Sequence, residues 1–467
     1  MARPRAVRVR SSFGTSRTRW ALAFAVAAVV VIISCGVALD EAVDRDRLVA
    51  SWGEPGGRWH TGGWRECSPE EERALTEEQR AEFERLRSIG YLAGSTPMPS
   101  NSGVIVYDAL RASDGLNFYT SGHFPGAVLM DMEGRVIHTW RHGFVEAWKA
   151  CGALELPRSN KTAGYWRRAR LFENGDVLAI FEGIALIKVD RDSRLLWGHF
   201  GGAHHDLDVA ADGTIYVLTR EARIVPRRDP KRPLLEDFIT VLDPDGNELS
   251  RISLLEAFER SPYAAMLDDM ARSGDAFHTN TVELLDGSVA DALPPFEAGN
   301  LLVSMREPGV IAVVDPEARE VVWALVGSWK KQHQPTVLDN GNVLIFDNQG
   351  DAGASRVIEF DPVALEPVWL YRGDKRGDFF SRECGSNQRL PNGNTLITES
   401  DRGKAFEVTP DGEVVWKYLN PEKSGPDSRS IATIFEMIRI GPAFPTDWLG
   451  SDFACRAARR RATFERS

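Results

Sequence analysis

Three histidines come at the same place in three copies of a short repeat. The copies read HDLDV, HTNTV and HQPTV, and in each the histidine precedes an equivalent valine by four residues. They are His205, His278 and His333. A single histidine at the start of a strand is usually a core or surface ring with satisfied hydrogen bonds, whereas three in one register predict a shared site. A neutral imidazole near pH 7 can act as a nucleophile, a proton carrier or a metal ligand.

Polar and basic residues accompany these histidines. Asn280 follows His278 by two residues, and Arg306 ends the nearby segment LLVSMR. Arg167 and Ser386 hold the histidine position in two further copies of the repeat. Arg167 is therefore a candidate for the same site on register alone.

Two kinds of site are compatible with this set. Three imidazoles could bind zinc or iron and leave one coordination position open. Alternatively, Arg306, Asn280 and the imidazoles could donate hydrogen bonds to a group that resembles sulfate or phosphate. Arg306 would repel a cation, and no carboxylate shares the histidine register. The anion site is therefore favoured, and we expect neither a metal nor another cofactor.

The elements that must position these residues are visible as repeats from Gly103 onward. One unit is a strand, an aspartate at a turn, and a second strand that ends in tryptophan. Its copies are MDMEGRVIHTW, VDRDSRLLW, VDPEAREVVW, FDPVALEPVW and VTPDGEVVW, which end at Trp140, Trp197, Trp323, Trp369 and Trp416. A divergent copy, LDPDGNELSRI, lacks the tryptophan. We interpret the tryptophans as packing groups between neighbouring units.

The other unit is a pair of apolar strands joined by a tight Asn-Gly or Asp-Gly turn, as in LFENGDVLAIF, VAADGTIYVLT, VLDNGNVLIFD and RLPNGNTLITE. Hairpin pairs that recur about every 40 to 50 residues, each too small to fold alone, are typical of a β-propeller. The sequence therefore predicts an all-β, six-bladed β-propeller over residues 101–449, with the first blade beginning near Gly103. The segment IATIFEMIRI, from Ile431, is expected to close the ring against that blade.

This fold would bring the three histidines together. The innermost strand of each blade lines the central channel, so residues at one repeat position converge on a ring around the axis. Side chains alternate along an extended strand, so the register favours His205 over its neighbour His204, which is expected to point the other way.

The N-terminal region predicts a membrane anchor. Residues 20–39, WALAFAVAAVVVIISCGVAL, form an uncharged run long enough to span a bilayer as a helix. Arginines in the basic tail 1–19 place the N-terminus in the cytoplasm and the rest of the chain on the periplasmic or extracellular side. A cleaved signal peptide and lipoprotein processing at Cys35 remain alternatives.

Two shorter regions flank the predicted propeller. Residues 40–100 form a juxtamembrane linker with one short amphipathic helix, which begins with a capping box of Thr76 and Gln79. Residues 450–467 form a basic C-terminal tail.

The net charge and the cysteine spacing argue against two further classes of function, nucleic-acid binding and zinc binding by cysteines. The net charge of -11 argues against non-specific binding to nucleic acid, which requires a basic face. None of the cysteine spacings matches a zinc motif, and disulfide pairing in an oxidising compartment stays open. The cysteines are Cys35, Cys67, Cys151, Cys384 and Cys455.

Several motifs together resemble those of the bacterial arylsulfate sulfotransferases, which do not use a nucleotide sulfate donor. They are HHDLDVAADGTIYVLTR, FHTNTVELL followed by LLVSMR, QHQPTVLDNGNVLIFDN, and SNQRLPNGNTLITES followed by FEVTPDGEVVWKY. The resemblance extends from about Gly103 to Leu449. It implies an exported six-bladed propeller with its active site in the central channel, an aryl sulfate as donor and a phenol as acceptor.

The resemblance also implies residue roles. His333 would take the sulfuryl group as a sulfohistidine, and a second phenol would then collect it in a ping-pong cycle. His278, Asn280 and Arg306 would bind the sulfuryl oxygens, and His205 would protonate the departing phenolate and deprotonate the incoming phenol. Ser386 and Thr398 receive no role.

Two other functions remain open at this point. The propeller could be a non-catalytic scaffold or sensor that binds an anion, because one fold serves many functions. It could also be a metal-dependent enzyme that uses the three channel histidines. A long N-terminal domain found in some family members is replaced here by the anchor and the helical linker, which leaves acceptor specificity and oligomeric state open.

Overall fold

The structure is a computed structural model of residues 1–467. It describes residues 58–61, 76–87, 93–150, 163–351, 353–373, 377–424 and 429–450. Within these ranges, no helix is both long and apolar enough to cross a bilayer. The predicted anchor 20–39, the basic tail 1–19 and all but the first residue of the tail 450–467 lie outside them, as do all of the cysteines except Cys384.

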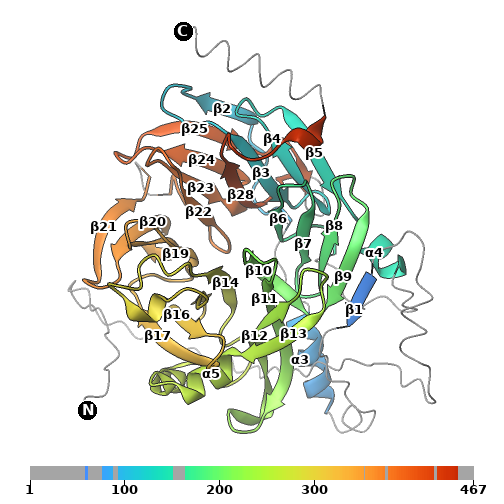
Figure 1. Ribbon diagram of the computed structural model, residues 1–467, viewed down its shortest axis with the longest axis vertical. Helices are drawn as coiled ribbons and strands as arrows, with labels where there is room; N and C mark the ends of the chain where they lie inside the picture. The colour runs from blue at the N-terminus through green and yellow to red at the C-terminus, as the bar shows by residue number, and fades with distance from the viewer. Residues whose placement is uncertain are drawn as a thin grey trace.

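The described residues form six antiparallel blades around a central axis, which confirms the predicted all-β propeller (Figure 1). From the channel outward, blade 1 contains β28 (Ile434–Ile440), β3 (Leu116–Ser121), β4 (Gly126–Met130) and β5 (Val136–Arg141). Blade 2 contains β6 (Arg168–Leu171), β7 (Val177–Phe181), β8 (Ala185–Val189) and β9 (Leu195–Phe200). Blade 3 contains β10 (Ala203–Val209), β11 (Ile215–Val225), β12 (Asp229–Leu242) and β13 (Glu248–Ser253).

The remaining three blades follow in chain order. Blade 4 contains β14 (Thr279–Leu284), β15 (Leu301–Met305), β16 (Val310–Asp315) and β17 (Glu320–Val326). Blade 5 contains β18 (His333–Val337), β19 (Val343–Asp351), β20 (Ala354–Asp361) and β21 (Glu366–Tyr371). Blade 6 contains β22 (Ser386–Arg389), β23 (Thr395–Glu399), β24 (Lys404–Val408) and β25 (Val414–Leu419).

Both ends of the propeller sequence close the ring. β28, near the C-terminal end, pairs antiparallel with β3, as predicted for the segment from Ile431. β2 (Gly103–Tyr107) does not open the first blade, as its position in the sequence suggested, but pairs with β25 on the outer edge of blade 6. Blades 1 and 6 are therefore joined twice. β2, which precedes β3 in the chain, extends blade 6, and β28, which follows β25, completes blade 1.

Segments outside the repeats cover the blades. β1 (Arg58–Thr61) adds a parallel strand to β9, and β26 (Lys423–Ser424) pairs with β27 (Ser430–Ile431). Within the described residues, the helices are α3 (Glu77–Arg87), α4 (Phe144–Ala150), α5 (Leu254–Arg260), η1 (Ala264–Asp269), η2 (Pro294–Phe296), η3 (Ser400–Arg402) and η4 (Asp447–Leu449). α3 begins with the predicted capping box, because the backbone N–H of Gln79 donates to Thr76 Oγ1 at 3.1 Å and the Gln79 side chain accepts from Thr76 N at 2.8 Å.

Four of the five repeated tryptophans donate a hydrogen bond to the next blade, which confirms their predicted packing role. In blade 1, Trp140 Nε1 donates to the carbonyl of Gly175 in the first turn of blade 2, at 2.9 Å. Across the closure, Trp416 Nε1 of blade 6 donates to Met132 O of blade 1 at 2.8 Å. Equivalent bonds join Trp197 to Pro244 and Trp369 to Pro410.

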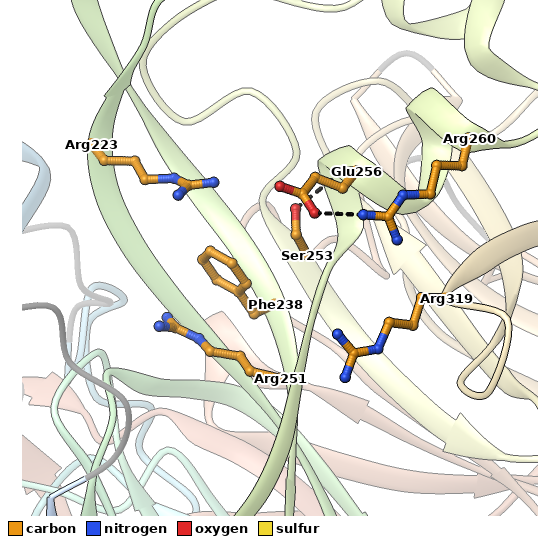
Figure 2. A pocket seen from close by; sticks show the side chains of 7 residues that line it. All are labelled: Arg223, Phe238, Arg251, Ser253, Glu256, Arg260 and Arg319. Carbon is orange, nitrogen blue, oxygen red and sulfur yellow. Dashed lines mark hydrogen bonds and ion pairs between the residues drawn. The ribbon is translucent and has the colours of Figure 1, made fainter.

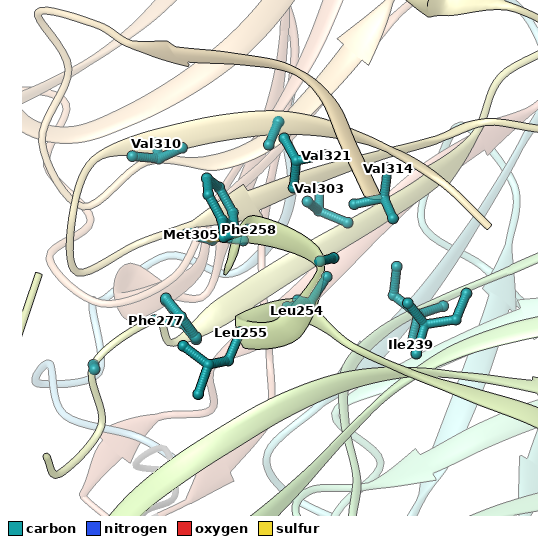
Figure 3. Packing of buried hydrophobic residues seen from close by; sticks show 14 of the residues in the cluster. Ile239, Leu254, Leu255, Phe258, Phe277, Val303, Met305, Val310, Val314 and Val321 are labelled. Carbon is teal, nitrogen blue, oxygen red and sulfur yellow. The ribbon is translucent and has the colours of Figure 1, made fainter. Parts of the chain in front are cut away.

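The apolar core is divided among the interfaces between blades. The cluster between blades 3 and 4 is shown in Figure 3, where Ile239 and Phe258 approach Val303 and Val314. Five further clusters lie at the other interfaces, each built from the alternating apolar residues of two neighbouring sheets. With the apolar faces buried in this way, polar residues at the channel ends of the inner strands can meet around the axis.

Candidate active site in the central channel

The structure gathers the predicted site residues in blades 3, 4 and 5. His205 lies in β10, His333 is the first residue of β18, and His278 directly precedes β14. The rings of His205 and His278 are 4.9 Å apart between centroids. All five predicted residues are buried, with exposed fractions of 8% or less; they are His205, His278, Asn280, Arg306 and His333.

The backbone is irregular where the channel histidines lie. His205 and His278 have positive φ angles of 55° and 49°, and Gln334, next to His333, has 47°. The inner strands β10, β14 and β18 each carry a register shift at this point, whereas β6 and β22 pair without one. Such bulges and left-handed residues cost energy and often re-aim a side chain at a functional site.

His204 is a functional candidate that the sequence prediction placed wrongly. An extended strand would direct it away from His205, but Nδ1 of His204 lies 2.7 Å from Nδ1 of His205. The reason is the bulge, in which the residues between Ala203 and Leu207 are opposed by a single residue of β11. Strict alternation of side chains fails across such an insertion.

Asn348 fixes the orientation and the tautomer of His333. Its amide nitrogen donates to Ser381 O at 2.8 Å and to Cys384 O at 2.9 Å, so its oxygen Oδ1 faces Nδ1 of His333 at 2.8 Å. An amide oxygen only accepts hydrogen bonds, and therefore Nδ1 carries the proton. Nε2 then holds the lone pair, and this buried atom has no hydrogen-bond partner among the described residues.

The surroundings keep His333 neutral. Its pKa is well below the ordinary value because the ring is buried and because Arg306 and Arg167 lie near it. The imidazole is thus uncharged at pH 7, which is the nucleophilic form. Arg167, which the repeat register made a candidate, is therefore close enough to His333 to affect its pKa. The guanidinium of Arg167 lies 5.4 Å from the ring centre of Phe435.

His278 is oriented by a carboxylate. Its Nδ1 lies 2.5 Å from Oδ2 of Asp275 and donates a hydrogen bond to that oxygen, so Nε2 is the ring nitrogen that can contact a ligand. Burial alone would raise the pKa of Asp275, but the proximity of His278 and of Arg220 lowers it to about 2. Asp275 is therefore a carboxylate at neutral pH.

Asn280 and Arg306 are also held in place. Asn280 Nδ2 donates to Gln332 O at 2.7 Å, directly before His333, and its nitrogen has a second N–H. The backbone N–H of Arg306 donates to His278 O at 3.2 Å, and its guanidinium bonds to Glu383 at 2.7 Å. Both residues are thus tied to the segments that carry the histidines.

One group of side chains has metal-ligand geometry. Atoms of Glu182, His204 and His205 lie within 4.8 Å of one another. Arg220, however, places Nη2 3.4 Å from Oε1 of Glu182 and supplies positive charge where a cation would bind. His278 and His333 do not belong to this group, so the three histidines of one register do not form a single set of metal ligands.

A basic hollow lies outside this cluster. It has a volume of about 150 Å³ and is lined by side chains that Figure 2 shows, namely Arg223, Phe238, Arg251, Ser253, Glu256, Arg260 and Arg319. Three of its arginines form ion pairs, with Glu236, Glu221 and Glu256. The lining offers charge but no histidine or other strong nucleophile, so the channel is the better candidate for chemistry.

Among the solved structures that resemble this chain are three of low sequence identity. A protein of unknown function from Bacteroides caccae has a TM-score of 0.45 at 14% identity, over 70% of this chain and 98% of that one. A virginiamycin B lyase from Staphylococcus aureus has a TM-score of 0.33 at 11% identity, over 56% and 71%. A streptogramin B lyase has 0.40 at 12%, over 76% and 96%.

The family comparison is specific. No curated protein matches the chain. The model of the arylsulfotransferase (ASST) family matches residues 169–421, more than half of the chain and a span that includes all five predicted site residues. The sequence motifs around the channel histidines had suggested the same family. The chain belongs to the arylsulfotransferase family.

Proposed function

We propose that this enzyme moves a sulfuryl group from an aryl sulfate to a phenol through a sulfohistidine at His333. Family membership supports arylsulfotransferase activity in general. The observation that carries the specific mechanism is the state of His333: Nδ1 is held by Asn348 at 2.8 Å, while the buried Nε2 has no hydrogen-bond partner among the described residues. A neutral imidazole with one nitrogen fixed and the other available is suited to nucleophilic attack.

In the first half of the cycle, the lone pair of His333 Nε2 attacks the sulfur of the donor. The bond between sulfur and the aryl oxygen breaks, its electron pair leaves with the phenolate, and His205 supplies a proton to that oxygen. The sulfohistidine keeps its proton on Nδ1, and this N–H donates a hydrogen bond to Oδ1 of Asn348. Arg306 and the second N–H of Asn280 donate to the sulfuryl oxygens, which shift most in the transition state. Since Nδ1–H of His278 already donates to Asp275, His278 donates to these oxygens through Nε2–H when both of its ring nitrogens are protonated.

In the second half, a phenol takes the place of the released product. His205 accepts the phenol proton as the oxygen attacks sulfur, and the bond between sulfur and Nε2 breaks. His333 returns to its starting form without a nucleotide, a metal or an external reductant. The two half-reactions are identical in kind, which is why one set of residues serves both.

A single experiment tests this proposal against its alternatives. The full chain and the variant His333→Ala are incubated with p-nitrophenyl sulfate, and phenol release, bound metal and protein mass are measured. We expect metal-independent release by the full chain, with an adduct of sulfate mass that His333→Ala lacks. Binding of the aryl sulfate without release would favour an anion-binding scaffold, and activity that requires metal would favour a metal enzyme at Glu182, His204 and His205.

The predicted anchor belongs to the same proposal. We infer that residues 20–39 hold the propeller on the extracytoplasmic side of a membrane, because their length and lack of charge suit a spanning helix. Cell fractionation of the full chain and of a chain that begins at residue 40 tests it. Membrane association of both chains in equal amount would contradict the inference.

A further inference from the structure

We propose that His204 and Asp237 relay protons to and from His205 during sulfuryl transfer. This inference rests on the proposed function, since it concerns how the acid–base histidine is recharged. His204 lies behind His205, with the two Nδ1 atoms 2.7 Å apart. On its far side, Nε2 of His204 lies 3.7 Å from Oδ1 of Asp237.

The three groups form a buried line with compatible hydrogen-bonding capacity. Their residues are no more than 2% exposed. Two Nδ1 atoms at 2.7 Å require one to donate and the other to accept. Nε2 of His204 and Oδ1 of Asp237 each lack a hydrogen-bond partner among the described residues. An approach of about half an ångström or slightly more would bring these two atoms into a hydrogen bond.

Burial explains why a relay is needed. The pKa values of His204 and His205 lie well below the ordinary value because both rings are buried, and because His278 and Arg220 lie close to both. An imidazolium at either position is therefore disfavoured. A neutral imidazole can donate from one nitrogen only if the other receives a proton in the same event, so that no charged ring accumulates.

Asp237 is the group that can hold the proton. Its burial and the negative charge of Asp275 raise the pKa of Asp237 to about 7. Its other oxygen accepts from the backbone N–H of Thr279 at 2.6 Å, which keeps the carboxyl group in place. Two other carboxylates lie nearby. Asp275 is bound to His278. Glu182 Oε1 lies 3.4 Å from both Nδ1 of His205 and Nη2 of Arg220, so Glu182 is paired with the Arg220 cation, and its other oxygen accepts from the backbone N–H of His205.

The proton balance closes over one cycle. In the donor half-reaction, Nε2–H of His205 passes to the departing phenolate, Nδ1–H of His204 passes to Nδ1 of His205, and the Asp237 carboxyl proton passes to Nε2 of His204. Asp237 becomes a carboxylate, and both rings stay neutral with exchanged tautomers. His205 Nε2 now holds a lone pair, which takes the proton of the incoming phenol while the other two transfers reverse.

The test compares two donors that differ in their need for a proton. p-Nitrophenolate is a weak base that leaves without much help, whereas phenolate from phenyl sulfate is a strong one. Relative to the unaltered chain, the His204→Gln variant should have a kcat/KM that is about 100-fold lower for phenyl sulfate but less than about threefold lower for p-nitrophenyl sulfate. An equal loss for both donors, or no loss for either, would overturn the relay.

A matched control and a second variant complete the experiment. His199 is also fully buried, but it lies in the outer strand β9 near Glu248, so His199→Gln should not discriminate between the donors. Asp237→Asn keeps an oxygen for the Thr279 N–H and removes the proton. The unaltered chain should lose activity toward phenyl sulfate as the pH rises past about 7, because Asp237 then loses its proton. The Asp237→Asn variant should turn over phenyl sulfate more slowly, at a rate that does not change over that pH range. Identical pH profiles would overturn the relay even if His204→Gln fails to fold.

The outcome is separable from the proposed function. If the unaltered chain releases no phenol from either donor, the sulfotransferase proposal itself fails. If it turns over both donors and the variants show no dependence on the leaving group, the transfer chemistry stands and the relay is wrong.

Discussion

Asn348 accepts a hydrogen bond from Nδ1 of His333 at 2.8 Å, and two backbone carbonyls hold its amide nitrogen so that it cannot turn around. This contact determines which nitrogen of His333 is protonated. It lies within blade 5, since Asn348 is in β19 and His333 begins β18. The hairpin that forms the channel wall thus also sets the state of its histidine.

Replacement of Asn348 should therefore slow the chemistry. Asn348→Ala removes a hydrogen bond worth about 1–2 kcal/mol, which corresponds to a loss in kcat of roughly 5- to 30-fold. The rate of adduct formation in rapid-mixing experiments is the measurement. Asn340→Ala, in the exposed turn of the same hairpin, is the control and should keep the rate. A change in KM alone would argue against a role in orienting the ring.

The pH dependence of adduct formation should follow the lowered pKa of His333. The neutral ring persists below the ordinary range of histidine because it is buried near Arg306 and Arg167. With p-nitrophenyl sulfate, which requires little protonation of the leaving group, the rate should stay level from pH 8 to about 6.5 and fall only in more acidic solution. A decline already centred near pH 6.5 would show that His333 is not shielded as the structure indicates.

Asp237 should also make the free energy of unfolding depend on pH. Its pKa is about 7 in the folded chain and near 3.8 when exposed, so the unfolded chain ionises first as pH rises. Between these values the unfolded state binds fewer protons, and the free energy of unfolding falls with increasing pH. Asp237→Asn lacks this loss. Its stability relative to the unaltered chain should rise between pH 4 and 7 and then level off, as measured by denaturant unfolding; a constant difference would contradict the account.

Arg306 should be sensitive even to a conservative change. A lysine keeps the charge but loses the planar set of donors that can hold two sulfuryl oxygens. Arg306→Lys should lower kcat/KM for the donor by about 100-fold or more. Arg135→Lys, an exposed arginine on blade 1 paired with Asp131, serves as the control. Equal activity of both variants would remove Arg306 from the transition-state contacts.

Trp416 lies at the closure of the ring, between blades 6 and 1. Its indole N–H bonds to Met132 O of blade 1, and its ring is fully buried. Trp416→Phe should lower the free energy of unfolding by about 1–3 kcal/mol, through the lost hydrogen bond and the cavity left behind. Thermal unfolding measures this, and activity per folded molecule should not change. Unaltered stability would mean that β28 and β2 alone secure the closure.

Repetition made the fold predictable from sequence. Trp140 and Trp416 are each the last residue of a copy of the same repeat, and the indole N–H of each donates to a backbone carbonyl of the next blade. The repeated sequence pattern therefore predicted a contact between residues that are distant in the chain. Closure by the segment from Ile431 followed from the same count of units. The place of β2 did not, because a single strand outside the repeat can pair with either edge blade and its sequence does not say which.

The site was predictable only where the register was informative. His205, His278 and His333 share a repeat position, and the structure brings their blades together. His204 was misplaced because a bulge, which has no reliable sequence signal, cancels the alternation of side chains. Asn348 could have been found, since Phe346 opposes His333 across the Asn-Gly hairpin and Asn348 follows two residues later.

The central claim is the covalent use of His333, and trapping the intermediate tests it most directly. The full chain is mixed with p-nitrophenyl sulfate without a phenol acceptor and then quenched, and its peptides are sequenced by mass spectrometry. We predict one sulfuryl group on the peptide that contains His333, lost when a phenol is added and absent from His333→Ala. Turnover by the full chain with no modified His333, or with the group on another residue, would contradict it.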